Sequence, residues 1–229
     1  MAGLLITGTD TGVGKTVFTA ALARHLRRQG VALAVCKPVA TGAEWVGNRW
    51  LSEDTRRLGE ASGCQDYDRI TPWSFPEPAA PPVAARQQGV SLSLEKIAGA
   101  VRSLEAPDRF VLVEGVGGLL CPLTDHETVA DLAQRLGYPL IVVARRALGT
   151  LNHTLLTLEV ARSRRLPLAG VVVSETMPPR SVAERTNVDE LRRRIGVPLL
   201  TVLPHRSDDT QVGEALAGVD WRRLALQQP

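Results

Sequence analysis

Gly8-Thr-Asp-Thr-Gly-Val-Gly-Lys-Thr16 is the stretch that decides the fold. It follows an apolar run, Leu4–Thr7, and precedes a segment with helical spacing near Lys15–Gln29. A strand, a glycine-rich turn and a helix start form a phosphate-binding loop, because glycines let backbone N–H groups curl around an anion at the positive end of the helix. Lys15 can then reach the outer phosphates, and the Thr16 hydroxyl can bind Mg²⁺. The stretch therefore predicts a nucleoside triphosphate site.

The loop is one residue longer than the standard pattern, in which four residues separate the first glycine from Gly-Lys-Thr. Here five residues, Thr9–Val13, stand between Gly8 and Gly14. A glycine-rich turn with a chance Gly-Lys-Thr is the alternative, but the strand–loop–helix context favours a phosphate site. The residues that we expect around the phosphates are Gly12, Val13, Gly14, Lys15, Thr16 and Val17.

The composition suits one α/β domain over residues 1–229. Of the 229 residues 44% are hydrophobic and 22% charged, and the formal net charge is +3. The arginine clusters lack the aromatic-rich basic stripe of a nucleic-acid-binding surface, and no apolar run approaches the length of a membrane span. The three cysteines have neither zinc nor disulfide spacing. We expect a cytoplasmic protein that binds neither nucleic acid nor membrane.

Lysine is scarce in this chain. Of the 27 basic residues, only Lys15, Lys37 and Lys96 are lysines. Lysine places a compact ammonium against a phosphate, whereas a guanidinium is a wide planar fork. Two of the three lysines fall in or beside the predicted phosphate site. Lys96, in a predicted surface helix, shows that lysine also occurs here by chance.

Short apolar runs alternate with helical patterns along the whole chain. Apolar and polar residues do not alternate strictly within these runs. This pattern is typical of strands that are buried on both faces of a parallel sheet. The predicted strands are Leu4–Thr7, Ala32–Lys37, Phe110–Val113, Leu140–Ala144, Leu168–Val173 and Leu199–Leu203. The predicted helices lie near Lys15–Gln29, Glu53–Ala61, Leu94–Leu104, Val129–Leu136, Leu151–Arg164 and Val182–Arg194. This order predicts a doubly wound, mostly parallel sheet with helices on both faces. Two long segments, Pro38–Ser52 and Pro72–Gly89, interrupt it as surface excursions or a substrate wall.

Ligands bind at the carboxyl ends of parallel strands, so the residues there are candidates. Lys37 stands at the tip of the second predicted strand; a solvated lysine at a loop start is the alternative. The strand Phe110–Val113 ends in Glu114, as a strand carrying a metal-binding carboxylate does. The glycines in Gly115-Val116-Gly117-Gly118 permit close approach of the backbone to a ligand.

Asp54 and the segment Leu148–His153 are weaker candidates. Asp54 opens a helix behind the expected N-cap Ser52, where an acid commonly complements the helix dipole. With Thr16 and Glu114 it would complete an oxygen site for Mg²⁺. Leu148–His153 forms a strand-to-helix turn whose helix N-terminus could bind a carboxylate.

These residues together resemble the dethiobiotin synthetase family, over nearly the whole chain. The matching segments are, in order, Gly8–Thr16, Lys37–Gly42, Val113–Gly118, Leu148–His153 and Pro178–Pro179. Each is modest alone, but together and in this order they are specific. The long phosphate loop is itself a mark of the family.

The resemblance implies a P-loop NTPase fold and an ATP-dependent cyclo-ligase of biotin biosynthesis. Members of the family use ATP, Mg²⁺ and CO₂ to convert 7,8-diaminopelargonic acid to dethiobiotin, ADP and phosphate through a carbamic-phosphoric anhydride. The resemblance also implies a homodimer whose sites are completed across the interface.

The resemblance assigns roles to individual residues. Lys15, Lys37 and Thr11 would be catalytic, with Lys15 on the β- and γ-phosphates and Lys37 on the carbamate and the transferring phosphoryl. Mg²⁺ would be held by Thr16, Asp54 and Glu114. Further nucleotide contacts would come from Gly115, Val116, Gly117, Ser174, Glu175, Pro204, His205 and Arg206. The diamine would be bound by Thr11, Thr41, Gly117, Leu148, Gly149, Thr150 and Asn152, the turn Leu148–Asn152 belonging to the other subunit.

The chain departs from the family at two places. Gly12 stands where members often carry Glu, and Ser174 stands where some members carry an adenine-reading Asn. Because Ser has fewer donors than Asn, the resemblance does not extend to a strict preference for ATP.

Two other classes share the expected sheet. A switch ATPase of the partitioning or nitrogenase-reductase type would carry an extra lysine early in the loop, where Thr9, Asp10 and Thr11 stand. A non-catalytic regulatory domain of the same fold would not need to retain Lys15, Lys37, Asp54 and Glu114.

Overall fold

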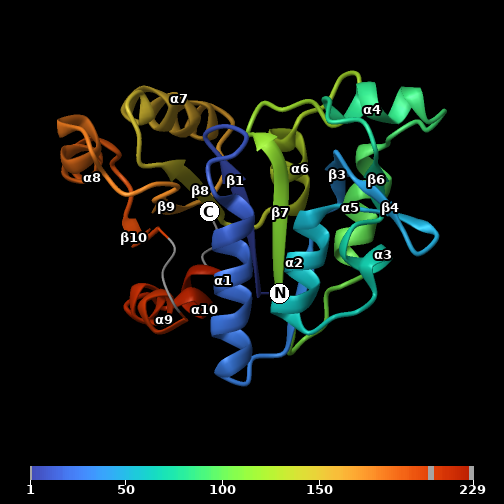
Figure 1. Cartoon of the computed structure of the whole chain (residues 1–229), viewed down its shortest axis with the longest axis horizontal. Helices are drawn as coiled ribbons and strands as arrows, with labels where there is room; N and C mark the ends of the chain where they lie inside the picture. The colour runs from blue at the N-terminus through green and yellow to red at the C-terminus, as the bar shows by residue number, and fades with distance from the viewer. Residues whose placement is uncertain (1, 206–208, 227–229) are drawn as a thin grey trace.

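The computed structural model describes residues 2–205 and 209–226. Its centre is a six-stranded sheet in the order β10-β9-β8-β1-β7-β2, and every pair is parallel (Figure 1). The strands are β1 (Ala2–Gly8), β2 (Leu33–Cys36), β7 (Phe110–Gly118), β8 (Leu140–Arg145), β9 (Leu168–Ser174) and β10 (Leu199–Leu203). All six predicted strands are confirmed, and this sheet is wholly parallel.

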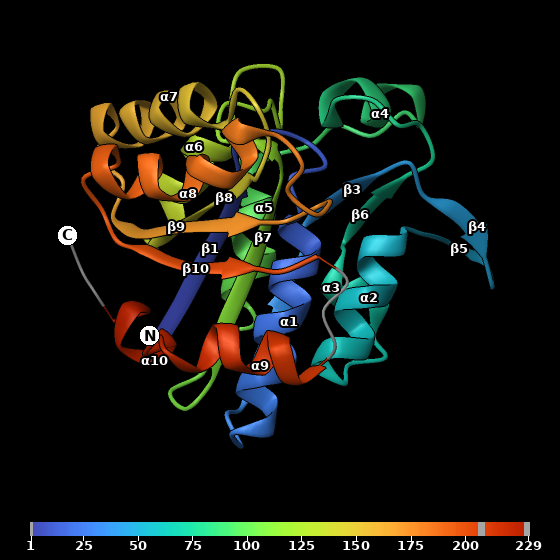
Figure 2. The ribbon, with the colours of Figure 1, turned by 60° about the vertical axis from the view of Figure 1, so that its left-hand side comes forward.

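Helices cover both faces of the sheet, which is why its strands are apolar along their length (Figure 2). One face packs against α1 (Lys15–Arg28), α2 (Glu53–Ser62), α9 (Asp209–Ala217) and α10 (Trp221–Leu224). The other packs against α5 (Leu94–Arg102), α6 (Val129–Leu136), α7 (Thr150–Ser163) and α8 (Val182–Arg194). The predicted doubly wound α/β fold is therefore confirmed.

The two long segments that interrupt the alternation hold secondary structure of their own. The first contains β3 (Val39–Thr41) and a hairpin of β4 (Glu44–Val46) and β5 (Arg49–Leu51), which projects from the body in Figure 2. The second contains β6 (Trp73–Phe75) and α4 (Pro81–Gln87), and the short helix α3 (Tyr67–Ile70) lies between the segments. Because β3 pairs in parallel with β6, the two excursions form one small layer beside the main sheet.

The order of the strands places the phosphate loop near the middle of the sheet. β1 lies between β7 and β8, so the loop that follows β1 has the ends of both strands beside it. Within the described residues, no helix combines the length and the apolar character that crossing a membrane requires.

Candidate active site

The glycine-rich loop joins β1 to α1 with two residues in the left-handed region. Gly12 has φ 70° and Gly14 has φ 99°, which L side chains rarely adopt. A Cβ at Gly14 would also lie 2.4 Å from Ser174 Oγ, so a larger residue would collide with the end of β9. Gly14 is the N-cap of α1 and provides no side-chain cap. The first N–H groups of α1 are therefore free for an anion.

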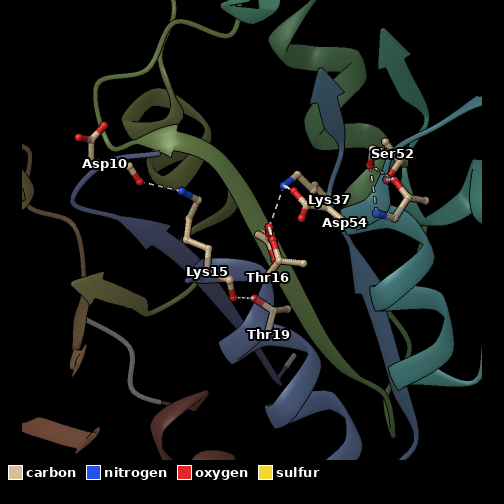
Figure 3. Close-up of polar contacts among 10 residues, drawn as sticks. Asp10, Lys15, Thr16, Thr19, Lys37, Ser52 and Asp54 are labelled. Atoms are coloured by element: carbon tan, nitrogen blue, oxygen red, sulfur yellow. Dashed lines mark hydrogen bonds and ion pairs between the residues drawn. The ribbon is translucent and has the colours of Figure 1, made fainter. Parts of the chain in front are cut away.

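Lys15 bends back over this loop, as Figure 3 shows. Its Nζ donates to the backbone oxygen of Asp10 at 2.9 Å, and the side chain is buried. Burial lowers the pKa of Lys15, and the attraction of Glu114 only partly opposes this effect. An anion at the loop would stabilise the charged form, so the site favours a phosphate electrostatically.

Lys37 and Glu114 meet because their strands are neighbours. β2 pairs with β7 so that Cys36 lies opposite Val113, and the next residue on each strand carries the charge. Lys37 Nζ donates to Glu114 Oε1 at 2.8 Å, and the Thr16 hydroxyl donates to the same oxygen at 2.7 Å. Lys37 also forms an ion pair with Asp54, from the first turn of α2 (Figure 3). Four predicted site residues thus converge from four elements.

The buried charges in this cluster stabilise one another. Glu114 is fully buried and Lys37 is 5% exposed. Burial disfavours the charged form of Lys37, but the attraction of Glu114 and Asp54 outweighs it and raises the pKa of the lysine. Burial alone would raise the pKa of Asp54, yet the charge of Lys37 and hydrogen bonds from Lys37 and Thr16 lower it. The shifts in the pKa of Lys37 and of Asp54 therefore both favour the charged form of the side chain.

The oxygen atoms in this cluster suit a magnesium ion. Glu114 Oε2 is buried and has no hydrogen-bond partner among the described residues, and a cation would satisfy it. Thr16 and Asp54 add a hydroxyl and a second carboxylate, the hard donors that Mg²⁺ prefers alongside phosphate oxygens and water. Across residues 2–205 and 209–226, no three His, Cys, Asp or Glu side chains gather as a metal site. The donor set fits an ion that a nucleotide helps to hold.

The glycines after Glu114 belong to β7, which is longer than predicted. A Cβ at Gly118 would lie 3.4 Å from Gly8 O, and one at Gly117 would lie 2.8 Å from Cys121 Sγ. These glycines let β7 run directly beside the phosphate loop. A cleft of about 370 Å³ opens there, lined by Thr9, Asp10, Thr11, Gly117, Gly118, Leu119, Leu120, Cys121, Leu156, Thr157 and Val160.

The predicted carboxylate turn lies at the end of β8 but does not line this cleft. Gly149, with φ 91°, is the N-cap of α7, and α7 has no side-chain cap. Leu148 is 83% exposed and Asn152 is also exposed, whereas Thr150 is buried. The lining of the cleft therefore contains Thr11 but not the turn Leu148–Asn152. Thr41, at the end of β3, is half-buried and also lies outside the cleft lining.

The residues predicted to flank the base lie where β9 and β10 end. Ser174 is buried against Gly14, so it does touch the phosphate loop. The Glu175 carboxylate forms an ion pair with Arg146 and accepts from the His205 N–H at 3.4 Å. Pro204 and His205 are half-buried, and Arg206 lies outside the described residues.

Sequence reasoning missed two polar residues that hold the carboxylate turn, Arg146 and Asn187. Arg146 contacts Glu175 and two carbonyl groups of α8, and Asn187 Nδ2 donates to Ala147 O at 2.9 Å. A sequence signal was available for Arg146, because this arginine stands between an apolar strand and a turn that contains a glycine. No comparable signal marks Asn187, whose partner lies 40 positions earlier.

The fold and the site define a P-loop nucleotide-binding protein. A ParA family ATPase from Chlorobium tepidum superposes with a TM-score of 0.53 at 14% identity, covering 97% of this chain and 90% of that one. At this identity the likeness concerns the fold. It agrees with the predicted P-loop NTPase architecture.

The sequence comparisons narrow the class. A family model described as an AAA domain matches residues 2–212. A curated protein of Anaeromyxobacter dehalogenans (strain 2CP-C), named ATP-dependent dethiobiotin synthetase BioD, is 44% identical and covers 96% of this chain and 97% of its own length. One of the same name from Aromatoleum aromaticum is 42% identical over 92% of this chain and 95% of its own length. The chain belongs to the dethiobiotin synthetase family, as the resemblance of its motifs predicts.

Proposed function

We propose that this chain is an ATP-dependent dethiobiotin synthetase. One amine nitrogen of 7,8-diaminopelargonic acid attacks the carbon of CO₂ and loses a proton, which gives a carbamate. A carbamate oxygen takes the γ-phosphoryl group of ATP, and ADP leaves. The second amine nitrogen then attacks the carbonyl carbon and loses a proton, and phosphate leaves as the cyclic urea closes.

The observation that carries the proposal is the second lysine beside the phosphate loop. Lys37 lies buried at 2.8 Å from Glu114, which also accepts from Thr16 of the loop. An ordinary P-loop hydrolase needs Lys15 but no further buried ammonium at the end of the neighbouring strand. A carbamate brings its own negative charge to the transferring phosphoryl, and a second lysine neutralises it.

The remaining residues position and neutralise the reactants, because phosphoryl transfer requires alignment and charge more than a covalent catalyst. The loop from Gly12 to Val17 binds phosphate oxygens through backbone N–H groups, and Lys15 binds the outer phosphates. Thr16, Asp54 and Glu114 would hold Mg²⁺. When bound, that ion would supply charge neutralisation at the phosphates.

We further propose a cytoplasmic homodimer in which each subunit completes the other's site. Thr11 and Thr41 would face the diamine. The turn Leu148–Asn152 of the partner would hold the remote carboxylate. The separation of this turn from the cleft beside Thr11 supports a contribution across an interface. Exposed apolar side chains support the same arrangement, because such side chains are commonly covered by a partner. They are Leu148 in the turn and Leu120 and Leu156 at the cleft.

The nucleotide preference follows from the end of β9. Ser174 offers one hydroxyl where a longer amide would offer two N–H donors and an oxygen. Glu175 is already paired with Arg146. We therefore propose that nucleotides other than ATP also serve as phosphoryl donors.

Isotope labelling tests the reaction. The purified chain is incubated with 7,8-diaminopelargonic acid, ¹³C-bicarbonate, ATP and Mg²⁺, and the product is analysed by mass spectrometry. We expect dethiobiotin with the label in its ureido carbonyl, formed in a one-to-one ratio with ADP. Nucleotide hydrolysis without labelled dethiobiotin would favour the switch-ATPase alternative instead.

A further inference from the structure

We propose that Arg146 is a positioning residue for the turn Leu148–Asn152, which it fixes in the shape that binds the substrate carboxylate. The inference rests on the proposed function, in which this turn serves the partner subunit's diamine. It concerns a residue that is not among those lining the cleft beside the phosphate loop.

Every nitrogen of the Arg146 guanidinium is already used. Nε donates to Glu184 O at 2.6 Å, Nη2 donates to Arg185 O at 3.2 Å, and Nη1 pairs with the Glu175 carboxylate. The two carbonyl groups belong to the first turns of α8, and Glu175 follows β9 directly. Three of the five N–H donors, one on each nitrogen, are bonded to the protein, and these bonds fix the plane of the guanidinium, so we assign Arg146 a role through what it holds in place.

The backbone at Arg146 is fixed as well. Its N–H donates to Ser174 O at 3.0 Å, which continues the pairing of β8 with β9. The Arg146 and Glu175 side chains are 16% and 13% exposed, so their ion pair is largely shielded from water. A shielded pair loses little strength to screening, and it leaves an uncompensated charge when one partner is removed.

A second tie acts one residue further along. Asn187 of α8 is 4% exposed, and its Nδ2 donates to Ala147 O at 2.9 Å. The same carbonyl oxygen accepts from the Thr150 N–H at 3.2 Å, which closes the turn onto the start of α7. Arg146 and Asn187 therefore hold successive residues of the turn against one helix.

The first residues of the turn have few other contacts. Leu148 is 83% exposed, so apolar packing against the core begins only at Leu151. α7 begins without a side-chain cap, and the Thr150 hydroxyl is buried without a hydrogen-bond partner in the described part of the chain. The N–H groups at the start of α7 and the Thr150 hydroxyl are hydrogen-bond donors without a side-chain acceptor. A carboxylate suits them, because one of its oxygens could accept from the N–H groups and the other from the hydroxyl. Their binding geometry then depends on polar ties from α8.

Comparing two diamine substrates distinguishes a positioning role of Arg146 from a general loss of structure in its variants. The probes are 7,8-diaminopelargonic acid and 7,8-diaminononane, which has the same two amines but no carboxylate. For Arg146→Gln we expect KM for the diamino acid to rise about tenfold or more, since small misplacements of binding groups cost such factors. We expect kcat/KM for the diaminononane to stay within about twofold of the unsubstituted chain.

Arg162→Gln is the matched control. Arg162, near the end of α7, also donates from its guanidinium to a backbone carbonyl, that of Ile195 at the far end of α8. The Arg162→Gln substitution removes the same charge and a similar hydrogen bond to α8. We expect it to leave KM for both diamines unchanged.

Two further variants extend the test if Arg146→Gln folds poorly. Arg146→Lys keeps the charge but cannot reach Glu175 and both carbonyls together, so we expect partial recovery of KM for the diamino acid. Asn187→Leu removes the second tie and should raise the same KM. Equal losses for both diamines, or an Arg146→Gln variant that behaves like Arg162→Gln, would overturn the inference. An unsubstituted chain that forms no cyclic urea from either diamine would overturn the proposed function itself.

Discussion

Lys37 is held by two carboxylates, and the arrangement depends on the small size of an ammonium group. Its Nζ reaches both Glu114 and Asp54 from the end of β2 while remaining 5% exposed. A guanidinium there would have to place five N–H donors in a space that holds three. This requirement accounts for a lysine at position 37 in a chain whose basic residues are mostly arginine.

Lys37→Arg should keep the fold and lose at least ~10²-fold in turnover, because a misplaced stabilising group costs roughly 3 kcal/mol or more. The measurement is the rate of dethiobiotin formation at saturating substrates. Lys96→Arg is the control, since Lys96 is the other lysine outside the phosphate loop and is exposed. Near-normal turnover of Lys37→Arg would reduce Lys37 to a structural charge.

Glu114→Gln should weaken the Mg²⁺ dependence of nucleotide binding. The amide keeps an oxygen that can accept from Thr16 and Lys37, but it is a poorer ligand for a hard cation. Its loss of charge should also lower stability by about 1–3 kcal/mol, since Lys37 keeps one charged partner instead of two. Mg²⁺ titration of ADP binding by calorimetry measures the first effect, and an unchanged titration would remove Glu114 from the metal site.

These candidates could be predicted from the sequence because each follows directly from a local pattern. Lys37 and Glu114 each stand at the end of an apolar run, and parallel strands bring such ends together. Arg146 and Asn187 could not be found this way. Their partners lie 29 to 40 positions away, and only the packing of α8 onto the turn brings them into contact.

At the scale of elements, the alternation of apolar runs and amphipathic segments predicted the six sheet strands and the helices on both faces. The elements of the excursions were not predicted. β3 to β6 are each three residues long, too short for a periodic signal, and β3 pairs with β6 across more than thirty intervening residues. β7 exceeded its predicted end because Gly118, beyond a shift in register after Glu114, still pairs with Gly8 of β1.

Asp131 lies in the first turn of α6 and links this helix to the end of α7, so a titratable group stabilises the start of α6. Its carboxylate accepts from the Thr128 N–H at 2.7 Å and from Arg164 Nη1, next to the end of α7, at 2.7 Å. Burial alone would raise the pKa of Asp131, but hydrogen bonds from Thr128 and the Arg164 guanidinium lower it below its ordinary value of 3.8. Its stabilisation is therefore complete above that value and is lost as the pH falls through the lowered pKa.

Asp131→Asn should lower the free energy of unfolding by about 1 kcal/mol at neutral pH, as loss of a helix cap does. The difference in Tm from the unsubstituted chain should shrink as the pH falls from about 5 to about 2. Thermal melts across this range measure it. Asp189→Asn, which removes an exposed i,i+3 pair with Arg192, should change Tm little at any pH. A pH-independent difference for Asp131→Asn would contradict the assignment.

At the scale of the whole molecule, the proposed site needs two chains. The loop from Gly8 to Thr16 and the turn Leu148–Asn152 lie at the ends of neighbouring strands, β1 and β8, yet the cleft beside Thr11 does not include the turn. A two-fold dimer would give two equivalent sites, each built from both chains.

Mixing two inactive variants tests this arrangement. One carries Lys37→Ala; the other carries Asn152→Trp, which fills the turn from an exposed helical position and avoids the strained φ of Gly149. In each heterodimer one site receives both lesions and the other neither. Random mixing in equal amounts should therefore restore about a quarter of the unsubstituted activity. Heterodimers that form but remain inactive would refute the shared site.

The position of β1 in the sheet also determines when the site can exist. β1 is synthesised before its neighbours β7 and β8, which follow about a hundred residues later, and such distant pairings form slowly. The site residues Lys15, Thr16 and Lys37 are therefore synthesised early, but they come together only after β7 has formed. Glu114 of β7 is the residue with which all three interact. A nucleotide added during refolding should leave the folding rate nearly unchanged and slow unfolding, since it binds only the finished sheet. Stopped-flow refolding and unfolding with and without ADP would measure this asymmetry.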